Sequence, residues 1–280
     1  MSTSSPSAGP TVTRELALAR SCFFCASCRY GYTNDVSEYL RAMNSAFASS
    51  RNGQGSIKRD GSGLYDACGV SGLHFAAGHG HTEIVTVILN SGLLSVDAEE
   101  LGCTSGRIAS GNDRSRTSSL QASAGRTALH WAAAAGHAHI VELLLKRDAW
   151  ADATDSLNGD TAMHYAVRCG GNEGILCVDV LLSKGAAITV KNQAGLCPLD
   201  EAILRGDPLM IKTMRRLRPN DVPRLLRGSK PIPGVSLLHV AAAVGTDAGV
   251  KILLNERYDQ HSKDNLRYNS HETVSEFINL

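Results

Sequence analysis

The sequence predicts an all-α protein made of stacked, similar helix–turn–helix units. Three segments share one pattern, reading GVSGLHFAAGHGHTEIVTVIL from 69, GRTALHWAAAAGHAHIVELLL from 125 and GVSLLHVAAAVGTDAGVKILL from 234. Looser copies begin at 159 and 195. Aromatic residues make up only 5% of the 280 residues, while Ala and Leu are frequent, which favours close packing between helices.

The spacing of the copies defines the unit. The same apolar register position is occupied by Leu73, Leu129, Met163, Leu199 and Leu238. These positions are separated by 56, 34, 36 and 39 residues, so one unit spans about 33 residues with insertions. The Met163 unit runs three residues longer than the others before its second apolar pair, which predicts an insertion between its two helices.

Each unit is predicted to form two short antiparallel helices. In the first helix, Leu129 and Ala132 recur at helical spacing, and Gly136 suits a left-handed helix end. In the second, Ile140 and Leu144 lie on one apolar stripe, and a turn rich in Gly, Asp and Asn follows. One such pair cannot bury its apolar face alone, so the copies must stack.

The pattern G-x-T-P-L-H-x-A-A-x-x-G-H resembles the ankyrin repeat. It is matched here by Gly125, Thr127, Leu129, His130, Ala132, Ala133, Gly136 and His137. Ala128 replaces the usual proline, whereas Pro198 retains it, and the resemblance covers about 190 residues from Gly69. It implies an elongated ankyrin-repeat solenoid that binds other proteins on a concave surface and has no catalytic machinery of its own.

The resemblance also implies a structural role for one recurring histidine. His130 occupies the motif position whose imidazole ties the turn to the neighbouring unit, and the same slot holds His74, His164 and His239. A reactive site would not recur at one register in several copies. These histidines are therefore interpreted as scaffold.

Five repeats and several irregular segments organise the chain. The predicted order is a disordered lead (1–13), a degenerate N-terminal capping repeat (14–43), a loop (44–66), a repeat (67–94), a Ser/Gly/Arg-rich insertion (95–124), two repeats (125–157 and 158–191), a degenerate repeat with a basic run (192–231), a repeat (232–260) and a C-terminal cap (261–280).

The residues predicted to contact a partner lie on the turn tips and on the exposed side of the first helices. Interface hot spots favour Trp, Tyr and Arg. The predicted protein-binding residues are Arg126, Trp131, Asp160, Tyr165, Arg168, Gln193 and Arg205. The rings of Trp131 and Tyr165 have an alternative interpretation, in which they pack against the adjoining repeat.

Two other clusters suggest competing functions. Cys22, Cys25 and Cys28 form C-x2-C-x2-C, which is part of a metal or redox pattern, but no fourth ligand follows at a suitable spacing. Packing in a tight first helix is therefore the favoured interpretation, and no metal or cofactor is expected. The basic run 212–230 suits a nuclear-import signal or an acidic partner, or else is a solvated helix face. It contains no aromatic residues for base stacking, which argues against nucleic acid.

The insertion offers one candidate modification site. Arg114, Arg116 and Ser119 form R-x-R-x-x-S, which resembles an acceptor for basophilic kinases. Such short patterns are frequent by chance, so an unmodified, solvated insertion is the favoured interpretation.

Composition limits the remaining functions. The formal net charge of +1 gives no reason to expect binding to bulk nucleic acid or anionic membranes, and eight cysteines with no secretory signal predict a cytoplasmic or nuclear protein. No phosphate-binding loop, nucleophile elbow or H-E-x-x-H motif is present, so neither an enzyme nor a small-molecule substrate is expected. The predicted function is binding of a partner protein as an adaptor or scaffold. A holding chaperone and an inhibitory or regulatory subunit are the alternatives.

Overall fold

The computed structural model describes residues 10–49, 62–66, 68–101, 125–222, 225 and 237–255. The chain divides into two compact units, Met1–Ala128 and Leu129–Leu280. In the described residues the regular structure is helical, and the only β-type pairings are three isolated bridges. None of the described helices is both long enough and apolar enough to cross a membrane.

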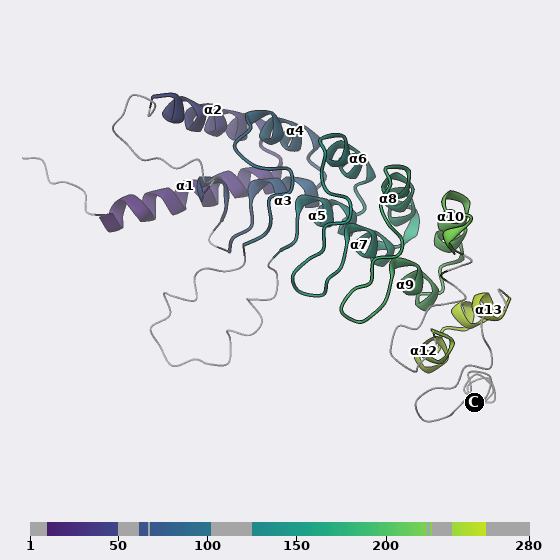
Figure 1. Cartoon of the computed structure of the whole chain (residues 1–280). Helices are drawn as coiled ribbons and strands as arrows, with labels where there is room; N and C mark the ends of the chain where they lie inside the picture. The colour runs from purple at the N-terminus through teal and green to yellow at the C-terminus, as the bar shows by residue number, and fades with distance from the viewer. Residues whose placement is uncertain are drawn as a thin grey trace, which may run out of the picture. The chain divides into compact units, whose positions relative to one another are not determined.

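The first unit contains two helix pairs. They are α1 (Pro10–Tyr30) with α2 (Thr33–Ser49), and α3 (Gly72–Gly78) with α4 (Thr82–Ser91), with the short 3-10 helix η2 (Ser62–Leu64) between them. α1 lies beside α3, and α2 lies beside α4, so the first helices form one layer and the second helices another (Figure 1).

The N-terminal helix pair is longer than the sequence predicted. α1 begins at Pro10, inside the segment expected to be disordered, and α2 continues to Ser49, beyond the expected boundary at 43. The segment TRELALARS in α1 consists mostly of residues with good helix propensity and contains no glycine or proline, so nothing in it stops the helix.

The second unit is also built from helix pairs. Its helices are α5 (Ala128–Ala134), which starts at the unit boundary, α6 (Ala138–Lys146), α7 (Ala162–Cys169), α8 (Gly171–Ser183), α9 (Pro198–Leu204), α10 (Pro208–Leu217), α12 (Leu237–Val244) and α13 (Asp247–Asn255). The first helices α7, α9 and α12 pack in series, and the second helices α6, α8 and α10 form the other layer (Figure 1).

The core consists of the apolar positions that define the repeat. Leu73, Leu129 and Met163 are at most 1% exposed, as are Leu199 and Leu238 in the later copies. Burial of a side chain of this size stabilises the fold by about 1.5–3 kcal/mol. The register read from the sequence therefore corresponds to the buried seam of each stack.

The extra residues of the Met163 unit extend a helix and do not form the inserted loop that the sequence predicted. α7 ends at Cys169 and α8 begins at Gly171, so only Gly170 lies between them. α8 has 13 residues, against nine in α6. Gly174 permits this extended start, because a Cβ there would lie 2.6 Å from the carbonyl oxygen of Ala166.

Between successive helix pairs the chain forms hairpin-like turns, which we call fingers. Isolated bridges between Tyr65 and Ser71, Glu99 and Thr127, and Thr154 and Thr161 lie at their bases. In the second unit, the Gln193 N–H donates to the Asn158 carbonyl oxygen at 2.7 Å, which joins two neighbouring fingers. Backbone hydrogen bonds therefore connect these two fingers directly.

The first residues that the sequence assigned to the insertion form part of one of these fingers. Residues 95–101, which the sequence assigned to the insertion, belong to the repeat, because the Glu100 N–H donates to the Arg126 carbonyl oxygen at 2.8 Å. The Gly125 N–H donates back to the Glu100 carbonyl oxygen at 2.8 Å. Residues 102–124, including Ser119, lie outside the described residues, as do most of 223–236 and the predicted cap 261–280.

Candidate protein-binding face

The motif histidines join each repeat to the next finger. Nδ1 of His74 accepts a hydrogen bond from the Ser71 hydroxyl (2.7 Å), and its Nε2 donates to the Arg126 carbonyl oxygen at 2.8 Å. Nε2 of His130 lies 3.0 Å from the Ala153 carbonyl oxygen. These side chains are almost fully buried, as is His239.

His164 repeats this arrangement in the next copy. Its Nδ1 accepts the Thr161 backbone N–H at 3.1 Å, and its Nε2 donates to the Leu196 carbonyl oxygen at 3.1 Å. Burial lowers the pKa of His164, although the hydrogen bond to Leu196 and the nearby carboxylate of Glu201 oppose that shift. The neutral imidazole is the form that these bonds require, because one nitrogen accepts while the other donates.

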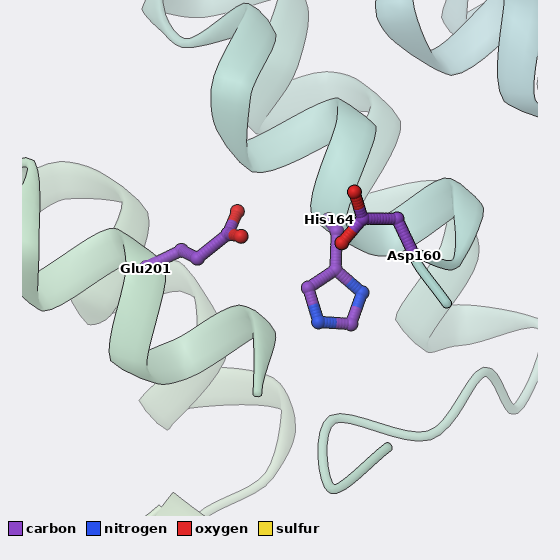
Figure 2. Close-up of side chains that lie close together, drawn as sticks. All are labelled: Asp160, His164 and Glu201. Carbon is purple, nitrogen blue, oxygen red and sulfur yellow. The ribbon is translucent and has the colours of Figure 1, made fainter. Parts of the chain in front are cut away.

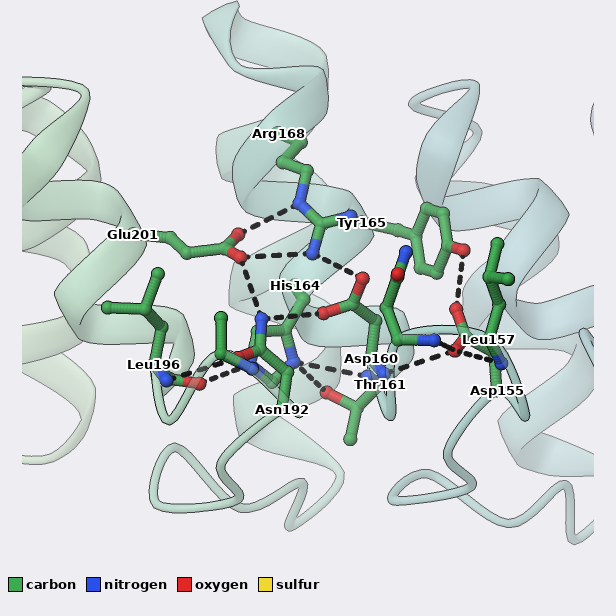
Figure 3. A network of polar contacts seen from close by, with 12 residues as sticks. Asp155, Leu157, Asp160, Thr161, His164, Tyr165, Arg168, Asn192, Leu196 and Glu201 are labelled. Atoms are coloured by element: carbon green, nitrogen blue, oxygen red, sulfur yellow. Dashed lines mark hydrogen bonds and ion pairs between the residues drawn. The ribbon is translucent and has the colours of Figure 1, made fainter. Parts of the chain in front are cut away.

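Asp155 organises the finger that precedes His164. Its Oδ1 accepts the N–H groups of Leu157 (3.1 Å) and Asn158 (2.7 Å), and its Oδ2 accepts the Tyr165 hydroxyl at 2.7 Å (Figure 3). Burial acts to raise the pKa of Asp155, but the hydrogen bonds from Tyr165 and the finger backbone outweigh it and hold the pKa below the ordinary value. The hydroxyl of Tyr165 is therefore hydrogen-bonded within the fold.

Arg168 lies at the centre of a charged network between two repeats. Its Nε and Nη2 donate to the two carboxylate oxygens of Glu201, each at 3.0 Å, and Nη2 also lies 2.5 Å from Oδ2 of Asp160 (Figure 3). Asn192 bridges the same carboxylates, donating to Asp160 at 2.9 Å and to Glu201 at 3.2 Å. The guanidinium also lies over the Tyr165 ring, 5.3 Å from its centroid.

The pKa of Arg168 reflects this network. Burial alone disfavours the charged guanidinium, but the hydrogen bonds and the negative charges of Glu201 and Asp160 more than offset it and raise the pKa. Arg168 therefore stays charged, and its charge is balanced within the fold.

Asp160, His164 and Glu201 form a group whose chemistry suits a divalent metal. Figure 2 shows the three side chains converging, and their ligand atoms lie within 4.8 Å of one another. The surrounding bonds do not fit a metal ion, however. Arg168 already binds both carboxylates, and both nitrogens of His164 are engaged by the backbone. The cation of this cluster is the guanidinium.

The predicted contact residues divide into two groups. Asp160 is only 1% exposed, so its prediction as a contact residue was wrong: its carboxylate binds Arg168 and Asn192 inside the stack. Arg126 is bonded to the buried Glu100 at 2.8 Å, and Arg168 is committed to the network. These two guanidinium groups fix the fold, and neither is a freely available cation.

The remaining predicted residues keep a surface position. Gln193, on a finger, and Arg205, after α9, are exposed, while Trp131 and Tyr165 are half-buried. Tyr165 packs edge-on against His130, with the ring centroids 5.5 Å apart, as the alternative interpretation of this ring expected. Val244, at the end of α12, adds an apolar side chain that is 61% exposed.

The N-terminal cysteines do not converge as metal ligands. Cys22 is exposed, whereas Cys25 and Cys28 are buried, and burial raises the pKa of both buried thiols. Sγ of Cys25 lies 3.6 Å from the Leu64 carbonyl oxygen. Among the described residues, no cysteine belongs to a group with metal-binding geometry.

Part of the basic run is also used within the fold. Arg216 forms an ion pair with Asp179 at 2.5 Å, and Arg218 lies 3.4 Å from a carbonyl oxygen in the last turn of α8 and from another in the turn that follows it. Lys212 is exposed on α10. The basic residues of the rest of the run, Arg224, Arg227 and Lys230, lie outside the described residues.

Sequence reasoning missed the acidic and amide residues that hold these fingers. Asp66, Asp155 and Asn192 each accept backbone N–H groups of their own finger. An Asp or Asn placed three or four positions before the repeat glycine was the available signal. Glu201 had no such signal, because its partner Arg168 comes from another repeat.

The comparisons with known proteins agree with this architecture. Residues 108–192 match the family model described as ankyrin repeats (3 copies). The protein named "Probable E3 ubiquitin-protein ligase XBOS33" from Oryza sativa subsp. japonica is 30% identical over 195 residues, which is 66% of this chain and 31% of that protein.

Two animal proteins match over shorter stretches. Ankyrin repeat domain-containing protein 13C of Danio rerio is 36% identical over 88 residues, 29% of this chain and 17% of that protein. Ankyrin repeat and SAM domain-containing protein 6 of Mus musculus is 36% identical over 84 residues, 30% of this chain and 9% of that protein. The chain thus spans less than a third of the length of these relatives.

The repeated helix pairs, the buried anchor register and the finger-binding histidines are one architecture, and the family model matches its central part. The chain therefore contains ankyrin repeats. Ankyrin repeats indicate a protein–protein interaction module.

Proposed function

We propose that this chain binds a partner protein on the face formed by its first helices and fingers, as an adaptor or scaffold, and that it acts by binding and not by catalysis. The supporting observation is that the charges of the network are neutralised by one another within the fold. Arg168, Asp160 and Glu201 neutralise one another and hold neighbouring repeats in register. A face fixed in this way loses little conformational entropy when a partner binds.

The exposed side chains of the second unit give this face its chemistry. Arg205 contributes a cation, Gln193 an amide on a finger, and Val244 an apolar group. With Arg168 paired to carboxylates, support for an acidic partner surface on this unit rests on Arg205. Ubiquitin-ligase activity is not part of the proposal, since the match covers only 31% of the rice protein with that name.

The proposal includes a cytoplasmic or nuclear location. The seven cysteines that the structure describes are free thiols, which suits a reducing compartment. Fractionation of cells that express the tagged full chain tests this part: recovery in a secreted fraction would contradict it.

The experiment compares two double variants matched in chemistry. The first, Arg205→Glu with Val244→Asp, changes one exposed cation and one exposed apolar side chain on first helices and their ends. The control, Lys212→Glu with Leu209→Asp, makes the same changes on α10, a second helix, where Leu209 is 58% exposed. Both must keep the helical circular dichroism and melting temperature of the unmodified chain.

Tagged chains are recovered from cells of the source organism, and co-purifying proteins are quantified by isotope-labelled mass spectrometry. We expect a specific partner to be lost from the first variant and retained by the control. Loss from the control alone would place the binding surface on the second helices and contradict the proposal. A broad set of unfolded clients, lost equally from both variants, would favour a holding chaperone.

A further inference from the structure

The first unit contains a small pocket between its two first helices. The pocket has a volume of about 200 Å³ and is lined by Cys22, Cys25, Ala26, Arg29 and Tyr30 of α1, by Phe75 of α3 and by Asp66. Pockets that enclose drug-sized ligands usually measure about 300–1,000 Å³. This pocket is therefore of a size for one amino-acid side chain and not for a cofactor.

The rim carries an exposed cation, Arg29. The Arg29 guanidinium lies over the Phe75 ring, 5.9 Å from its centroid. Within the described part of the chain, no carboxylate lies at ion-pair distance from Arg29, whereas Arg126 pairs with Glu100 and Arg168 pairs with both Asp160 and Glu201. A cation placed over an aromatic ring in this way remains able to bind an anion.

The acidic residue of the rim is already engaged. Oδ1 of Asp66 accepts the N–H groups of Cys68 and Val70, both at 2.9 Å, so its carboxylate holds its own finger. Tyr30 is 67% exposed beside Arg29, and Phe75 is half-buried. Arg, Tyr and Phe are residue types enriched at protein interfaces.

We propose that this pocket is a docking subsite for an acidic linear segment of a partner protein, with an apolar side chain of that segment in the pocket and a neighbouring carboxylate on Arg29. The inference rests on the proposed function of the chain as a protein-binding module. It adds a subsite in the first unit and names the chemistry of the segment that binds there.

The test uses synthetic nine-residue peptides as the probe. Each peptide has a central Leu, Ile, Phe or Met, flanked by Asp in one set and by Lys in a matched set. Binding of fluorescein-labelled peptides to the full chain is measured by fluorescence anisotropy up to millimolar protein. We expect binding by the acidic set and not by the basic set.

Three variants locate the binding. Arg29→Glu reverses the rim charge, and Ala26→Phe fills the pocket; each is expected to weaken the best acidic peptide by about tenfold or more. Arg41→Glu is the matched control, because Arg41 is exposed on α2 and does not line the pocket. The melting temperature of each variant is measured first, and Arg29→Gln replaces Arg29→Glu if the charge reversal impairs folding.

A second readout does not depend on the variants. Cys22 is exposed at the pocket, so a bound peptide should slow its alkylation by iodoacetamide, mapped by mass spectrometry. The half-buried Cys169 belongs to the other unit and should be unaffected.

Preference for the basic set, equal weakening by Arg29→Glu and Arg41→Glu, or no binding by either set would overturn the inference. Each of these results leaves the proposed function standing if Arg205→Glu with Val244→Asp still releases the cellular partner. Failure of this inference can therefore be distinguished from failure of the proposed function.

Discussion

Replacing Arg168 with methionine tests whether the charged network holds the second unit together. The change keeps an unbranched apolar stem beside Tyr165 but leaves Asp160 and Glu201, whose side chains are 1% and 11% exposed, without their guanidinium. Removing one partner of a buried ion pair costs about 3–5 kcal/mol. Because the Arg168 side chain is 35% exposed, solvent screens part of this loss, and we expect about 2–3 kcal/mol.

The free energy of unfolding is measured by urea titration followed by circular dichroism. Arg216→Met is the matched control: the same substitution removes an ion pair to Asp179, but the two side chains are 68% and 41% exposed. We expect a loss of less than about 0.5 kcal/mol there. Adding Asp160→Asn and Glu201→Gln to Arg168→Met should recover part of the lost stability, because neither carboxylate of the network is then left buried without its guanidinium. Equal losses for Arg168→Met and Arg216→Met would refute this reasoning.

Three further predictions concern backbone strain, packing and pH. Asp148 has φ +62°, a conformation that Gly185 adopts at the corresponding turn, so Asp148→Gly should raise the free energy of unfolding by about 0.5–1 kcal/mol, and a lower melting temperature would contradict this. Gly174→Ala should cost about 1–3 kcal/mol in urea titrations, because the added Cβ would lie 2.6 Å from the Ala166 carbonyl oxygen, and an unchanged midpoint would show that α8 is not held there. Burial lowers the pKa of His164 below 6.5, so the stability from its neutral form is present above about pH 6.5 and is lost as the pH falls through the lowered pKa. The melting temperature should therefore fall less between about pH 7.5 and 5 in His164→Gln than in the unmodified chain, and parallel pH profiles would argue against this origin.

The repeat register was predictable because it depends on local periodicity. Leu129 and Leu199 follow the same apolar spacing, and burying them is the main driving force for stacking. The motif histidine was equally predictable from the ankyrin resemblance, because its bonds to the neighbouring finger are made by backbone groups, which every sequence provides.

The charged contacts were not predictable in the same way. An arginine on the exposed side of a first helix, such as Arg168, indicates a contact residue unless the next repeat places an acid opposite it. Glu201 lies 33 residues away, and one sequence gives no signal for that pairing. Asp160 was misassigned for the same reason, because a turn position suggests exposure although its carboxylate is buried by its partners.

Hydrogen–deuterium exchange of the full chain, alone and with the captured partner, tests most directly whether the first helices and fingers bind that partner. We predict slower exchange in α7, α9 and α12 and in the finger that carries Gln193, with unchanged exchange in α6, α8 and α10. Protection confined to α6, α8 and α10 would contradict the account, because the partner would then lie on the second helices.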